Sequence, residues 1–249
     1  MQIGRLTGCA IVLLFVTNVR AAYTPIFGPP PGEVDHKIIL DELYGGDFAA
    51  DGVNYTNNTI TAVRVHDDLP DMGILGVVDG DPSDTADQLW HDGFVSASAE
   101  ARFAKYSQKF GYVEGFIGGT YQNLFNVTGS GFDVSGETDI GNLLTGKTWR
   151  WQRSGTNGPQ SSLVLENSDL QDHLVTYQIT GLNDGKTTWL LFFEDLTLPS
   201  GRPYEADFND LVVEVKACIP DDQVPTPEPA TALTLVGAII VLAGRYRIG

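Results

Sequence analysis

Acidic and amide side chains gather at the ends of two apolar runs near the C-terminal part of the sequence. The run at residues 189–193 ends in Glu194 and Asp195. The run at residues 211–215 is preceded by Asp207, Asn209 and Asp210. If the two runs are antiparallel strands, the five side chains meet at one end of a sheet. Clustered carboxylates repel one another unless protons or a cation intervene, and Ca²⁺ takes six to eight oxygen ligands. The spacing therefore predicts a calcium site.

The same residue types also suit a site without metal. Asp and Asn side chains accept hydrogen bonds from nearby backbone N–H groups and so cap turns. Asp207, Asn209 and Asp210 fit that role as well as they fit the role of calcium ligands. Both interpretations stay open at the level of sequence.

A second acidic cluster alternates with Gly and Pro and is a candidate for a second metal site. Its members are Asp79, Asp81, Asp84 and Asp87. The segment lacks the glycine at the sixth position of an EF-hand loop, and Trp90 stands where that loop has its glutamate. A solvated acidic loop explains the cluster equally well.

Two tryptophans in the segment Trp149-Arg150-Trp151 are candidates for glycan binding, because an exposed aromatic ring can stack on a sugar. The alternative is a strand in which Trp149 and Trp151 face the core and Arg150 points outward.

The sequence contains few patterns that would indicate an enzyme. The four histidines lack a paired zinc-binding spacing, and Ser154 lacks the Gly-x-Ser-x-Gly elbow of a hydrolase. No carboxylate pair is singled out by its context. We expect a protein that is not an enzyme, with a secreted hydrolase as the weakest alternative.

The composition of the 249 residues excludes a nucleic-acid-binding surface. There are 15 Lys and Arg against 32 Asp and Glu, a formal net charge of −17. Only Cys9 and Cys218 are present, and Cys9 lies in the expected leader, so no internal disulfide can form in the mature chain. A bound cation is then the natural source of rigidity in an exported domain.

The elements that must position these residues read as strands. Short apolar runs broken by Gly, Asn and Asp predict one all-β domain over residues 34–218, a β-sandwich or jelly-roll-like fold. A Gly-Leu-Asn-Asp-Gly turn is expected at 181–185. Residues 96–109 suit either a helix or strands. Expected strands lie at 37–40, 60–65, 73–78, 161–165, 174–179, 188–193 and 211–215.

The two ends of the chain have the features of export and membrane-anchoring signals. Residues 1–22 have the basic start and apolar run of a secretory signal peptide, and the Pro- and Gly-rich segment 23–33 reads as a mobile lead-in. At the other end, a Pro-rich linker at 219–229 precedes a short hydrophobic helix at 230–244 and a basic tip at 245–249. The order predicts a transient membrane anchor with its basic tip in the cytoplasm.

The C-terminal order resembles the PEP-CTERM sorting signal of exported bacterial proteins. The residues that carry the resemblance are Pro227, Glu228, Pro229, Arg245 and Arg247. It implies recognition by an exosortase peptidase, an inner-membrane-anchored precursor, and release to the cell surface or the extracellular matrix of a biofilm.

The paired acidic clusters resemble the DUF4114 domain over residues 171–217. That domain has an aromatic strand ending Glu-Asp-Leu and a later Asp-Phe/Tyr-Asn-Asp-Leu, which match residues 193–196 and 207–211. Glu205 stands where the domain commonly has Asp. The resemblance implies a secreted or adhesin-like protein with suspected calcium binding.

Together these patterns predict an exported, non-enzymatic, calcium-stabilised structural or adhesive module, with matrix proteins or exopolysaccharide as partners. A lectin-like module that binds exopolysaccharide is the alternative function.

Overall fold

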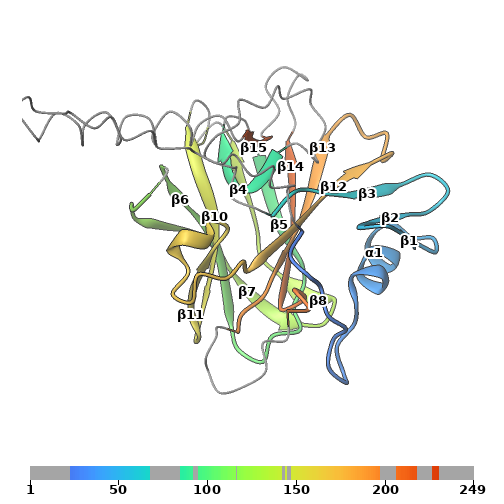
Figure 1. The fold of residues 1–249 in the computed structure, drawn as a ribbon, viewed down its shortest axis with the longest axis horizontal. Helices are drawn as coiled ribbons and strands as arrows, with labels where there is room; N and C mark the ends of the chain where they lie inside the picture. The colour runs from blue at the N-terminus through green and yellow to red at the C-terminus, as the bar shows by residue number, and fades with distance from the viewer. Residues whose placement is uncertain are drawn as a thin grey trace, which may run out of the picture.

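Two antiparallel sheets stack into a β-sandwich in the computed structural model of this chain (Figure 1). The fold class expected from the sequence is therefore confirmed. The structure describes residues 23–67, 85–91, 95–115, 117–141, 144, 147–196, 206–217 and 226–229.

Among the described residues, the larger sheet has eight strands in the order β1-β2-β3-β12-β13-β14-β5-β9. The bounds of these strands are β1 Ala49–Asp51, β2 Asn54–Thr56, β3 Thr61–Arg64, β12 Leu174–Thr180, β13 Thr187–Phe193, β14 Leu211–Ala217, β5 Val95–Ala101 and β9 Glu137–Gly141. All neighbouring strands in this sheet run antiparallel.

The second sheet has seven strands within the described ranges, in the order β15-β4-β10-β6-β7-β8 with β11 beside β10. Their bounds are β15 Thr226–Pro229, β4 Thr85–His91, β10 Thr148–Gly155, β6 Gln108–Glu114, β7 Tyr121–Ser130, β8 Asp133–Ser135 and β11 Gly158–Ser161. The helical elements with bounds inside the described ranges are α1 at His36–Tyr44 and a 3₁₀ turn, η3, at Val164–Glu166.

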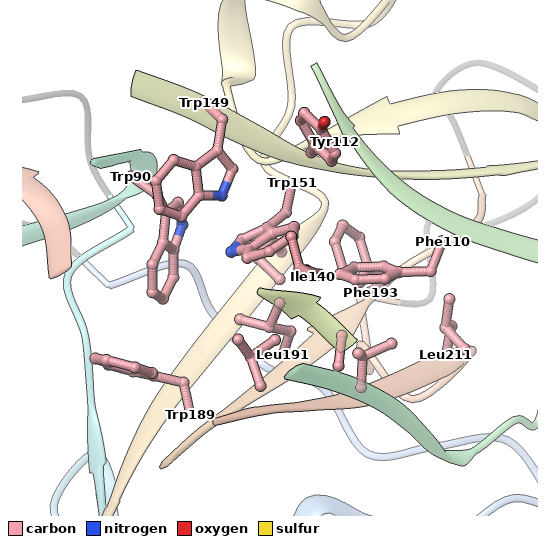
Figure 2. Packing of buried hydrophobic residues seen from close by; sticks show 14 of the residues in the cluster. Trp90, Phe110, Tyr112, Ile140, Trp149, Trp151, Trp189, Leu191, Phe193 and Leu211 are labelled. Atoms are coloured by element: carbon pink, nitrogen blue, oxygen red, sulfur yellow. The ribbon is translucent and has the colours of Figure 1, made fainter. Parts of the chain in front are cut away.

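The interior of the sandwich is aromatic. Trp189, Leu191 and Phe193 of β13 alternate toward the opposite sheet, as a strand requires. They meet Trp151 and Phe110 from β10 and β6, whose rings stack with centroids 5.2 Å apart (Figure 2). This packing between the sheets supplies the main apolar burial of the fold.

The outer face of the larger sheet is covered as well. Leu190 and Phe192, the intervening residues of β13, are fully buried in a second cluster that contains Ile39 and Leu40 of α1. Helix α1 lies beside β1 and β2 on this side of the molecule (Figure 1). Because β13 is buried on both faces, its sequence is a continuous apolar run instead of an alternating one.

Most of the strands expected within the described residues are found. The runs at 60–65, 174–179, 188–193 and 211–215 form β3, β12, β13 and β14. The turn at 181–185 joins β12 to β13, with Asn183 at φ 55° and Gly185 at φ 69°.

Two expected strands are wrong. Residues 37–40 belong to α1, where the Asp35 side chain accepts from the Ile38 N–H at 2.9 Å and begins the helix. Residues 161–165 leave β11 after Ser161 and enter the 3₁₀ turn.

Residues 96–109, which suit either a helix or strands by sequence, form β5 and the start of β6 and contain no helix. The run at 73–78 lies outside the described residues.

The described parts of the expected lead-in and of the expected Pro-rich linker both pack against the sandwich. The lead-in 23–33 is not a free tail, since Ile26 packs on the second cluster and the Phe27 N–H donates to the Ala206 carbonyl at 2.9 Å. Within the expected linker, β15 pairs with β4. The signal peptide, the 230–244 helix and the basic tip lie outside the described ranges. Within those ranges, none of the helices has the length and apolar character that a membrane crossing needs.

Candidate cation site

The hairpin of β13 and β14 brings the two acidic groups together at one end of the larger sheet. Phe193 pairs with Leu211, so the residues after 193 and before 211 lie side by side. One carboxylate oxygen each from Glu194, Asp195 and Asp210 lies within 4.8 Å of the other two. Two oxygens that share a Ca²⁺ at about 2.4 Å are at most about 4.8 Å apart. This spacing can therefore hold a calcium ion.

All five residues expected at this site are buried, but the Asp207 carboxylate is not one of the three that lie within 4.8 Å of one another. Their exposed fractions are Glu194 0%, Asp195 4%, Asp207 2%, Asn209 0% and Asp210 8%. Glu194 Oε2 and Asn209 Oδ1 have no hydrogen-bond donor in the described part of the chain. A buried acceptor without a partner costs about 1–3 kcal/mol, and more when it is charged. A proton or a cation at the cluster would offset this cost.

Backbone capping also occurs here, but it does not use every oxygen. The Asp195 N–H donates to Asp210 Oδ2 at 2.6 Å, and the Leu196 N–H donates to Glu194 Oε1 at 3.0 Å. Burial, followed by repulsion from Glu194 and Asp195, raises the pKa of Asp210 well above its usual range. The capping and cation interpretations are compatible, because the caps fix one oxygen of a carboxylate and orient the other.

The opposite sheet supplies polar residues that the sequence analysis missed. Gln108 Nε2 and Asn157 Nδ2 donate to the two carboxylate oxygens of Asp195 at 2.8 and 3.1 Å. Arg153 donates to the Asp195 carbonyl at 3.0 Å and to Gln108 Oε1 at 2.9 Å. Burial lowers the pKa of Arg153 to about 10, against the raising effect of nearby carboxylates, so it stays charged at neutral pH.

The loop entering β14 has an uncommon backbone. Ala206 and Phe208 adopt left-handed φ values of 47° and 54°. This conformation costs roughly 1–2 kcal/mol per non-glycine residue. Phe208 is fully buried in the second cluster and holds the loop in place. Strain of this kind, kept by surrounding packing, is characteristic of functional sites.

Of the second acidic cluster, only Asp87 belongs to the described residues. Asp79, Asp81 and Asp84 lie outside the described residues. Asp87 is not in a solvated loop, since it lies in β4 and is fully buried. Its neighbours are Asp67, which pairs with Arg64, and Asp172. Burial, then repulsion from Asp67 and Asp172, raises the pKa of Asp87 well above its usual range.

This buried carboxyl predicts a pH dependence. The folded pKa of Asp87 lies above its unfolded value of about 3.9, so the folded state holds the proton more tightly. Stability is then greatest below the unfolded pKa, and it falls by about 1.4 kcal/mol per pH unit as the pH rises through the folded pKa. Asp87→Asn should flatten that fall in urea unfolding curves measured between pH 4 and about 8. A parallel pH profile for the two proteins would contradict the assignment.

Trp149 and Trp151 are not a glycan platform. Both indoles are fully buried in the sandwich core (Figure 2). The core-facing alternative is right for these two residues, but Arg150 is also fully buried and does not point freely outward. Its Nε and Nη2 donate to the Glu166 carboxylate at 2.6 and 2.8 Å.

Comparisons with known proteins give a partial structural resemblance. No protein-family model matches the sequence, and no curated protein matches it. A high-affinity mannose-binding lectin of Ralstonia solanacearum aligns over 53% of this chain and 97% of its own, at 16% identity and a TM-score of 0.33. The Chromobacterium violaceum lectin CV2L, solved with alpha-methyl-fucoside, aligns over 53% and 97%, at 15% identity and a TM-score of 0.34.

A third structure is similar to the same extent. The C-terminal domain of the lectin BC2L-C from Burkholderia cenocepacia aligns over 55% of this chain and 99% of its own, at 14% identity and a TM-score of 0.32. Similarity this low does not carry a ligand over from those lectins to this chain.

Proposed function

We propose that this chain is a calcium-binding, non-enzymatic β-sandwich module that acts as a structural or adhesive component outside the cell. The observation that carries the proposal is the buried oxygen cluster of Glu194, Asp195 and Asp210 within 4.8 Å. These three residues offer only oxygen ligands, which suit Ca²⁺ and do not suit soft metals. The bound ion would neutralise the cluster and fix the β13–β14 hairpin.

Calcium should therefore raise the thermal stability of the purified protein. An ion present at about 100 times its dissociation constant adds roughly 2.7 kcal/mol, which is on the order of 5–10 °C in Tm for a domain of this size. The measurement is thermal unfolding in excess CaCl₂, in excess MgCl₂ and in EDTA. We expect the shift with Ca²⁺ alone, because Mg²⁺ requires a smaller and more regular octahedron. Equal melting in all three solutions would leave the acids as turn caps.

The localisation of the protein outside the cell is a separate part of the proposal. The leader at 1–22 and the ordered signal from Pro227 to Arg247 support export, exosortase processing and delivery to the cell surface or matrix. In cells that lack the exosortase, the uncleaved chain should stay in the inner membrane. Unchanged release in those cells would refute the sorting route.

A second candidate function is the binding of exopolysaccharide. An open groove of about 730 Å³ crosses the outer face of β5, β14 and β9. Ser98, Glu100, Glu137 and Glu214 line it, and Tyr44 and Lys216 border the same space. Carboxylates and hydroxyls of this kind accept and donate the hydrogen bonds that sugar hydroxyls need. If the module binds glycan, this surface is a better place than the buried tryptophans.

A glycan array probed with calcium present tests this candidate. Ser98→Arg fills the groove and should abolish any binding that uses it. Asn58→Arg, in the exposed turn between β2 and β3, adds the same side chain elsewhere and should leave binding intact. Loss of binding in both variants, or in neither, would exclude the groove as the binding surface.

A further inference from the structure

We infer that residues 23–36, here called the N-terminal strap, position the cation-binding loop and that calcium affinity depends on the docking of this strap. The inference rests on the proposed calcium site. It assigns a role to a segment whose first part, residues 23–33, is rich in Pro and Gly and suggests only a lead-in.

Three hydrogen bonds join the strap to the loop that enters β14. The Phe27 N–H donates to the Ala206 carbonyl at 2.9 Å. His36 Nε2 lies 2.8 Å from the Asp207 carbonyl oxygen. The Asn209 side chain donates through Nδ2 to the Val34 carbonyl at 3.0 Å. Three of the four successive loop residues from Ala206 to Asn209 are thus held by the strap.

The bond from Asn209 sets the direction of its amide. A backbone carbonyl only accepts, so the nitrogen of the Asn209 amide must face Val34. The oxygen, Oδ1, then lies at the other end of the amide, where it is buried without a donor among the described residues. An amide oxygen held in this way, without a donor, is available to a cation. If Val34 withdrew, the amide could turn and the oxygen would no longer be fixed.

His36 is suited to hold the Asp207 backbone rigidly. Burial is the main cause that lowers its pKa to about 3, so the ring is neutral at pH 7 and carries one N–H. Because the Asp207 carbonyl only accepts, that proton is on Nε2, and Nδ1 accepts from the Tyr177 hydroxyl at 3.2 Å. The ring also stacks on Phe192 with centroids 4.0 Å apart. The imidazole ring is therefore held in place by Tyr177 of β12 and Phe192 of β13, both in the larger sheet.

The other end of the strap is anchored to the sandwich. The Thr24 N–H donates to Asp67 Oδ2 at 2.6 Å, and the Thr24 hydroxyl donates to Asp172 Oδ2 at 2.8 Å. The strap is therefore tied at Thr24 and at α1, and it crosses the loop between these points. Such a tether can hold Ala206 and Phe208 in the left-handed conformation that the loop adopts.

Strap docking and ion binding should then be coupled in both directions. If the docked strap raises calcium affinity by a given factor, bound calcium raises the docking equilibrium by the same factor. Calcium should slow amide hydrogen exchange in residues 23–36, although the inferred ligands lie at positions 194–210. A strap that merely adds apolar burial would show no such response.

Paired substitutions at one exposed position test the inference. Phe27 is 56% exposed, so changing it should not unfold the protein. Phe27→Pro removes the N–H that donates to Ala206, whereas Phe27→Ala keeps it. We expect the proline variant to bind Ca²⁺ about 5- to 20-fold more weakly by isothermal titration, within the usual range of coupling between sites. The alanine variant should bind as the unchanged chain does.

A second pair examines His36 in the full chain. His36→Gln retains a side-chain donor for the Asp207 carbonyl and should recover part of the affinity that His36→Leu loses. Equal calcium affinity in the unchanged chain, Phe27→Pro and Phe27→Ala would overturn the role of the strap and leave the calcium site standing. No calcium binding by the unchanged chain would instead overturn the proposed function and the inference with it.

Discussion

Trp151→Ala should lower the free energy of unfolding by about 3–5 kcal/mol, the range for truncating a large aromatic side chain in a core. The indole is fully buried. It contacts Phe110 at 5.2 Å and Trp149 at 5.7 Å between ring centroids. Removing it leaves a cavity between the two sheets that their backbones cannot close. Urea unfolding followed by circular dichroism measures the loss directly.

Tyr106→Ala provides a matched aromatic truncation at the surface. Tyr106 is 37% exposed, so its replacement should change stability by only about 0.5 kcal/mol. If Trp151→Ala were as mild as this control, the tryptophan would not be a core residue. The interpretation of Trp149 and Trp151 as an exposed platform would then be restored.

Arg153→Met should destabilise the calcium-free protein by about 3–5 kcal/mol, as expected when one partner of a buried charged group is removed. Arg153 is fully buried beside Asp195 and is attracted by Glu194 and Asp210. Without its charge, the carboxylates repel one another with less compensation. Calcium should recover much of the loss, so the difference in Tm between CaCl₂ and EDTA should grow in this variant.

Lys186→Met removes the same charge from an exposed position. It should leave both the stability in EDTA and the response to calcium nearly unchanged, because exposed charges contribute little. If Arg153→Met lost stability equally in CaCl₂ and in EDTA, the guanidinium would act only through packing and hydrogen bonds. The electrostatic account of the cluster would then be wrong.

The sequence was informative where a strand pair and a chemical motif coincide. The apolar runs before Glu194 and after Asp210 are long enough to be recognised as strands, and an antiparallel pair necessarily joins their ends. That argument anticipated the meeting of the acidic residues, which the structure shows within 4.8 Å for Glu194, Asp195 and Asp210. It could not anticipate their burial, which depends on the opposite sheet.

The sequence contains a pattern that predicts the buried polar residues next to the site. Arg153 follows Trp149 and Trp151 at intervals of two, so strand alternation places it on the same inward face. Gln108 relates to Phe110 and Tyr112 in the same way. Two polar side chains on core-facing positions at one end of a sheet indicate a buried polar partner, here Asp195.

Other features depend on contacts between distant segments and leave no local trace. The sequence predicts a strand at residues 37–40, because these four residues alone resemble a short apolar run, but they lie in the helix α1. The bonds from Phe27 and His36 to the loop at 206–207 span more than half of the chain. Pro- and Gly-rich composition predicts an irregular backbone, but it does not tell whether that backbone is docked.

Isothermal titration of the purified protein with CaCl₂, beside Glu194→Gln/Asp210→Asn, tests the calcium site most directly. The double substitution keeps the size of both side chains and removes their charges. We expect saturable calcium binding by the unchanged chain, and a loss of affinity of at least about 100-fold in the variant, since the number of charged ligands sets the calcium affinity of an oxygen site over several orders of magnitude. Absence of saturable binding, or equal affinity in the two proteins, would contradict a calcium site at Glu194, Asp195 and Asp210.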